Sequence, residues 1–92
     1  MHWLRPVTLR LMIPARQHDP PTWEVTVDGR VIGWLTQRTL DNSSSIFIHA
    51  VGVYKPNGKR IDLEYSTDFR ERLEKLIEFD QDPERFRGLH LH

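Results

Sequence analysis

The dipeptide Asp28-Gly29 lies between two stretches in which apolar and polar residues alternate. Asp-Gly favours a two-residue type I′ turn, because both central positions of this turn need a positive φ. The alternation has the period of a half-buried β-strand. Residues 22–28 and 30–36 are therefore predicted to form a β-hairpin around this turn.

A two-residue turn also determines which residues of the hairpin face each other. Val25 is then expected opposite Ile32 and Trp23 opposite Trp34, so that these apolar pairs share one face of the sheet. The other face is expected to carry Glu24, Thr26, Val31, Gly33 and Leu35. A three-residue turn with a bulge would move these side chains to opposite faces.

Asn57-Gly58 is a second turn signal, and it separates two further alternating stretches, 46–54 and 60–65. The cross-strand pairs that this turn predicts are Tyr54 with Ile61, Gly52 with Leu63 and Ala50 with Tyr65. The small residues in these pairs leave room for a bulky element across that face.

The remaining elements are a first strand and a helix. Residues 5–13 alternate like a strand, with Pro6 near its start. Asp68 followed by Glu71 resembles a capping box, and apolar residues then recur at helical spacing. The sequence thus predicts an α+β fold. Its parts are an antiparallel β-meander of about five strands (about 5–13, 22–28, 30–36, 46–54 and 60–65) and one C-terminal helix (about 68–79) packed on one face.

A chain of 92 residues is the size of one domain. We expect a single sheet-plus-helix domain over 1–80 and a C-terminal tail over 81–92 that is either docked or flexible. The chain has no cysteine, which excludes disulfides and thiolate metal sites and agrees with the cytoplasmic location that we expect. No segment has the length and composition of a membrane span, so no membrane association is expected.

The sequence gives the least support to an enzyme, because it lacks any catalytic motif with a mechanism. His49 could act as a general base, but a strand histidine needs a suitable geometry first. His90 and His92 alternate on the tail, where His2 could join them, but a metal site needs three or four fixed ligands. We expect no catalytic residue, no metal site, no cofactor and no small-molecule substrate.

A single helix covers only one side of a sheet, which leaves the second face for a partner. This face is predicted to be the site of protein interaction, with either another protein or a second copy of the chain as the partner. Its candidate residues are Val31, Leu35, Phe47, Val51 and Val53.

The alternative is weak nucleic-acid binding that is largely independent of base sequence. Residues 1–60 hold eight Lys/Arg against four Asp/Glu, whereas residues 61–92 hold five against nine. Basic residues near the hairpin ends could contact phosphates while aromatic rings stack on bases. The candidate residues are Arg30, Arg38, Lys55, Lys59 and Arg60. The neutral total charge argues against this alternative.

Overall fold

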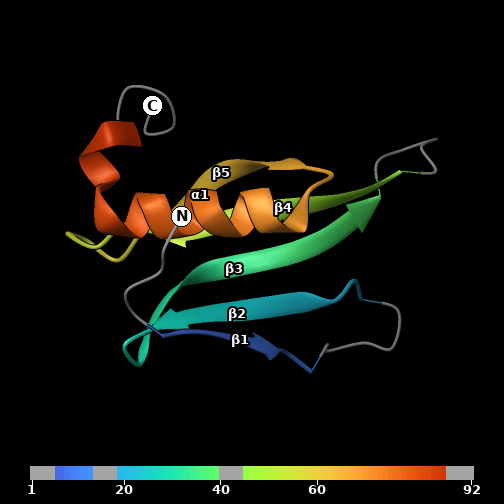
Figure 1. Ribbon diagram of the computed structural model, residues 1–92, viewed down its shortest axis with the longest axis horizontal. Helices are drawn as coiled ribbons and strands as arrows, with labels where there is room; N and C mark the ends of the chain where they lie inside the picture. The colour runs from blue at the N-terminus through green and yellow to red at the C-terminus, as the bar shows by residue number, and fades with distance from the viewer. Residues whose placement is uncertain (1–5, 14–18, 40–44, 87–92) are drawn as a thin grey trace.

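The computed structural model describes residues 6–13, 19–39 and 45–86. In it a five-stranded antiparallel sheet carries one α-helix on one face, which confirms the predicted α+β meander (Figure 1). The strands lie in the sheet in their sequence order. The elements are β1 (Val7–Leu11), β2 (Thr22–Val27), β3 (Arg30–Thr39), β4 (Ile46–Val53), β5 (Arg60–Ser66), α1 (Phe69–Gln81) and the 3-10 helix η1 (Pro83–Phe86).

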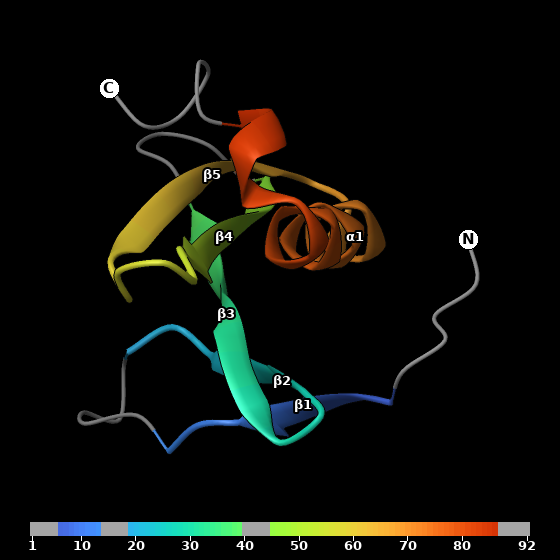
Figure 2. The ribbon, with the colours of Figure 1, turned by 90° about the vertical axis from the view of Figure 1, so that its left-hand side faces the viewer.

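The helix α1 begins directly after Asp68, as its sequence predicts. The Asp68 carboxylate accepts a hydrogen bond of 3.1 Å from the backbone N–H of Glu71, which satisfies a donor that the first turn leaves unpaired. The apolar side of α1 packs on β3, β4 and β5 (Figure 2). Its buried apolar residues are Leu73, Leu76, Ile77 and Phe79.

Small residues on β4 let the helix approach the sheet closely. A Cβ atom added to Gly52 would lie only 2.7 Å from Cδ2 of Phe79, and Ala50 is fully buried nearby in the same core. This is the close approach of a bulky element that the small residues predict. Beyond the helix, Phe86 of η1 packs against Phe79 with their ring centroids 5.6 Å apart.

The hairpin of β2 and β3 has the predicted turn but not the predicted register. Asp28 and Gly29 have φ values of 54° and 76°, and Val27 pairs with Arg30. A bulge then follows on β3, so that Val25 pairs with Gly33 and Trp23 pairs with Leu35. The predicted pairs Val25–Ile32 and Trp23–Trp34 are therefore wrong, because the bulge adds one residue to β3.

This shift moves Leu35 to the helix side of the sheet, where it is fully buried in the core. Its predicted place on the second sheet face is wrong. Trp34 takes the opposite position and lies on the side turned away from α1, next to Val51 of β4.

The connection between β4 and β5, in contrast, is longer than the two residues predicted. The N–H of Tyr54 donates to the carbonyl of Lys59 at 2.8 Å, and Gly52 pairs with Ile61 rather than with Leu63. A second bulge, at which Glu64 has a φ of 66°, brings Tyr65 opposite His49. The predicted pairs at this hairpin are thus wrong as well.

The β1–β2 hairpin extends past the helix, as Figure 2 shows. The ring contact between Trp23 and Phe69, at 5.2 Å between centroids, joins it to the start of α1. Within the described part of the chain, no helix is long and apolar enough to cross a lipid bilayer.

Candidate functional site

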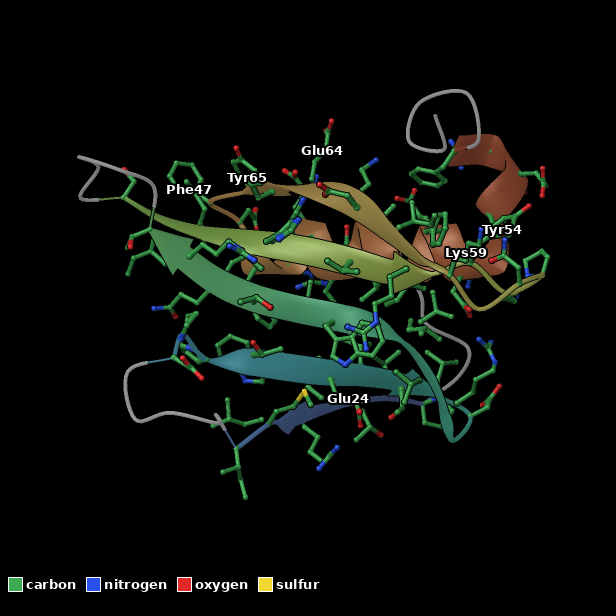
Figure 3. All side chains as sticks on the ribbon, turned by 180° about the vertical axis from the view of Figure 1, so that it is seen from behind. Glu24, Phe47, Tyr54, Lys59, Glu64 and Tyr65 are labelled. Carbon is green, nitrogen blue, oxygen red and sulfur yellow. The ribbon has the colours of Figure 1, made fainter. Side chains whose placement is uncertain are left out.

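The side of the sheet turned away from α1 is called the open face below, and Figure 3 views it directly. No described helix or strand covers it. Strand alternation and the two bulges determine which side chains it carries. They are Thr8, Arg10, Thr22, Glu24, Thr26, Val31, Trp34, Thr36, Arg38, Phe47, His49, Val51, Val53, Arg60, Asp62 and Tyr65.

A hollow of about 500 Å³ lies on the open face, beside the residues that follow β1 and precede β2. Trp34 and Val51, which are cross-strand neighbours, form part of its wall. The guanidinium of Arg60 stacks 4.2 Å from the centroid of the Trp34 ring. Arg60 also lines the hollow, and the other lining residues of the hollow are Met12, Ile13, Asp19, Pro20, Thr22, Thr36 and Arg38. The hollow therefore combines an aromatic and aliphatic surface with charged groups at its border.

An aromatic cluster flanks this hollow along β4 and β5. Tyr65 meets Phe47 edge to face at 5.8 Å and His49 at 5.9 Å between ring centroids. Phe47 and Tyr65 are visible together in Figure 3, at the β4–β5 side of the open face. Since Phe47 pairs with Arg38 of β3, the cluster continues toward the hollow.

His49 has partners on the open face that account for its position. Its Nε2 lies 3.0 Å from Oδ1 of Asp62, and that same oxygen accepts the backbone N–H of Glu64 at 2.7 Å. Asp62 thus links the histidine to the bulge residue. Catalysis would also need a nucleophile or substrate group held in line with this pair.

The candidate phosphate-binding residues are not brought together as one patch. Arg38 and Arg60 both line the hollow, whereas Lys55 and Lys59 are exposed around the β4–β5 loop. Arg30 lies on the helix side, where its guanidinium makes two hydrogen bonds with the carboxylate of Asp80, at 2.7 and 3.0 Å. These hydrogen bonds raise the pKa of Arg30.

Four of the five candidate interaction residues lie on the open face. Val31, Phe47, Val51 and Val53 are partly exposed on the open face, while Leu35 belongs to the core. Trp34 and Tyr65 are the open-face residues that sequence reasoning missed. A bulge in β3 turns Trp34 to this face, and a bulge in β5 turns Tyr65 to it. Gly33 is the sequence signal for the bulge in β3, since a glycine inside a strand often marks a bulge.

Among residues 6–13, 19–39 and 45–86, no three histidine or acidic side chains gather as a metal site. The candidate metal ligands His2, His90 and His92 lie outside these described residues. Comparison with protein-family models, with curated proteins and with solved structures gives no match.

Proposed function

We propose that this protein is a non-enzymatic accessory domain that binds a partner protein on its open face. The observation that carries the proposal is the hollow beside Trp34, which lies on a sheet face that no described element covers. A volume of about 500 Å³ is suited to one or two large side chains of a partner. The cytoplasmic location suggested by the lack of cysteine is part of this proposal.

The composition of the open face supports protein binding. Tryptophan, tyrosine, phenylalanine, methionine and arginine are enriched in protein interfaces, and tryptophan, tyrosine and arginine carry much of the binding energy. The hollow and the aromatic cluster contain all five types, in Trp34, Tyr65, Phe47, Met12 and Arg60. Aliphatic side chains on β4 complete an apolar centre, and the charged groups stand around it.

The charges around the hollow indicate the chemistry of the partner. The charged residues that line the hollow are two arginines, Arg38 and Arg60, and one carboxylate, Asp19. Arg38 is exposed and makes no ion pair with another described residue. A partner segment that places a bulky apolar side chain beside Trp34 and a carboxylate beside Arg38 would match both features. A second copy of the chain is one such candidate partner.

The proposal is tested with a library of random peptides displayed on phage and selected on the immobilised protein. We expect selected peptides to combine an aromatic or large aliphatic residue with an acidic one. Isothermal titration calorimetry should then show weaker binding to Trp34→Ala and Arg38→Glu, with unchanged binding to Lys75→Glu on the exposed side of α1. Peptides that bind all four proteins equally, or a selection that yields no binder, would contradict the proposal.

A second candidate function, nucleic-acid binding, is favoured by one specific observation. Trp34 and Arg60 form a stacked pair with Arg38 across the same hollow, and such groups can hold a base and its phosphate. Against it, the acidic groups Glu24 and Asp62 share this face. Fluorescence anisotropy with labelled single-stranded and duplex oligonucleotides at low salt separates the two. Salt-sensitive binding that is lost in Arg38→Glu would favour nucleic acid over a protein partner.

A further inference from the structure

The outer edge of β1 offers an unpaired row of backbone groups. The N–H of Met12 donates to the carbonyl of Thr22 at 2.9 Å, and hydrogen-bonded pairs alternate along an antiparallel ladder. In the register of β1 and β2, residues 8, 10 and 12 therefore point their backbone groups at β2. The N–H and C=O groups of Val7, Leu9 and Leu11 point away from β2, to an edge with which no described strand pairs.

Two of the three side chains on this edge are exposed although they are apolar. Leu9 is 41% exposed and Leu11 is 59% exposed, because the β1–β2 hairpin extends beyond the cover of α1 (Figure 2). Both lie on the helix side of the sheet, in register with Val25 and Trp23 of β2. The sole charge of the strand, Arg10, is on the open face and pairs with Glu24 at 3.0 Å.

The opposite edge of the sheet, β5, has the features that prevent pairing with another chain. Its register is interrupted by the bulge at Glu64, and it carries Asp62 as a further charge. The guanidinium of Arg72 also donates to the carbonyl of Leu63 at 2.9 Å, which occupies a β5 backbone acceptor. The pairing of β1 with β2 has no bulge, and the five residues of β1 include one charged residue. The two edges therefore differ in their capacity to accept a new strand.

We infer that β1 pairs with β1 of a second copy in an antiparallel arrangement, which joins two five-stranded sheets into one. A two-fold axis beside Leu9 aligns the full length of both strands. Leu9 then faces Leu9 of the second copy, and Val7 faces Leu11 of the second copy. These three hydrogen-bonded pairs supply about six intermolecular hydrogen bonds. Symmetric dimers of this kind need only one self-complementary patch.

The side chains support a second copy as the occupant. On the helix side, each apolar residue of β1 meets another apolar residue, so the exposed Leu9 and Leu11 and the partly buried Val7 of each chain are covered together. On the open face, Arg10 meets Thr8 of the second copy, and each Arg10 already has its own Glu24 as a counter-charge. No like charges are placed directly opposite each other in this register.

This dimer leaves both open faces uncovered and places them on the same side of one continuous sheet. The inference does not depend on the proposed function, since it uses the edge of the sheet rather than its open face. If both hold, the dimer is bivalent and binds a partner with two equivalent segments more tightly than one segment alone.

Single cysteines test the register directly, because the chain has none of its own. In the inferred dimer the two copies of residue 9 have Cα atoms about 5.5 Å apart, which suits a disulfide. The two copies of residue 11 are separated by four residue steps, or about 13 Å. Under mild oxidation of the folded protein, Leu9→Cys should form the covalent dimer at least about tenfold faster than its control, Leu11→Cys. Equal rates would overturn the inference.

Light scattering over a wide concentration range supplies the second measurement. The wild-type protein should reach the mass of two chains, and Leu9→Pro should raise the dissociation constant at least about tenfold. This proline removes only an N–H that points away from the sheet, and circular dichroism checks that the variant is folded. A mass of one chain at every concentration would overturn the inference. A dimer that Trp34→Ala abolishes and Leu9→Pro leaves intact would overturn it too, and would place self-association on the open face.

Discussion

Removal of Arg30 and removal of Asp80 from their ion pair should lower the stability of the protein by different amounts. Asp80 has 5% of its side chain exposed, whereas Arg30 has 44% exposed. Removal of Arg30 leaves a buried carboxylate without its counter-charge, which is the costly way to break a pair. Removal of the charge of Asp80 leaves a guanidinium that water can reach. We therefore expect Arg30→Met to destabilise the protein more than Asp80→Asn.

The magnitudes follow from the contacts. Two opposite charges about 4 Å apart attract by about 4 kcal/mol at an effective dielectric constant of about 20, and the exposure of Arg30 reduces this value. We expect Arg30→Met to lower the free energy of unfolding by about 3 kcal/mol. Asp80→Asn keeps the shape of the side chain and should cost about 1 to 2 kcal/mol. Arg70→Met breaks an exposed pair with Glu74 and serves as the control, at less than about 0.5 kcal/mol.

Urea unfolding followed by far-UV circular dichroism measures all four proteins at neutral pH. The double variant, with Arg30→Met and Asp80→Asn together, should lose less free energy of unfolding than the sum of the two single losses. The second change removes the charge that the first change leaves unpaired. A loss for Arg30→Met that is no larger than that for Asp80→Asn would refute the reasoning. So would a loss as small as that of the control variant.

The pH dependence of this pair follows from the raised pKa of Arg30, whose first cause is its hydrogen bonding to Asp80. A group whose pKa is higher in the folded state stabilises fully below the pKa of the unfolded state. This contribution is lost only as the pH rises through the folded value, at strongly alkaline pH. Between pH 6 and 9 the difference in stability between wild type and Arg30→Met should therefore show no trend from arginine titration, which urea unfolding across this range checks.

Three further changes probe the helix and its contact with the sheet, and Gly29→Ala in the β2–β3 turn serves as a control; urea unfolding measures all of them. Asp68→Ala should cost about 1 kcal/mol, because it removes a cap that accepts a backbone N–H of the first turn. Gly52→Ala should cost about 2 kcal/mol or more, since its Cβ would overlap Phe79, whereas Gly29→Ala has free space and should lose about 1 kcal/mol from its positive φ alone. A Gly29→Ala loss as large as that of Gly52→Ala would contradict this. Leu73→Ala should cost about 2 to 5 kcal/mol, because the side chain is buried against the sheet.

The parts of the fold that could be predicted are those whose cause is local in the chain. Asp28-Gly29 forms its turn because both residues adopt positive φ, and Asp68 caps α1 through a residue only three positions away. The regular alternation of 46–54 also placed Phe47, Val51 and Val53 on one face correctly. The strand order followed because short connections leave neighbours in sequence as neighbours in the sheet.

The registers could not be predicted, because their cause lies across the sheet and in the helix. A Cβ on Gly33 would lie 2.3 Å from the carbonyl oxygen of Val51 and 2.6 Å from Cδ1 of Leu76. The close approach at this point depends on β4 and α1, which are distant in sequence. The local pattern of β3 fits both the regular and the bulged pairing, and only tertiary packing chooses between them. This is why the sequence pattern predicts the wrong face for both Leu35 and Trp34.

The two bulges also explain why the open face carries Trp34 and Tyr65. With the register of β2 and β3 unbroken, Leu35 would lie on the open face and Trp34 on the helix side. The bulge exchanges them, so that an aliphatic residue fills the core and a tryptophan, with Arg60 stacked on it, borders the hollow. The bulge at Glu64 acts in the same way on β5, since it keeps Leu63 in the core and brings Tyr65 beside Phe47. Each bulge thus interrupts a regular ladder and adds one aromatic residue to the open face, and bulges that re-aim a side chain are common next to functional sites.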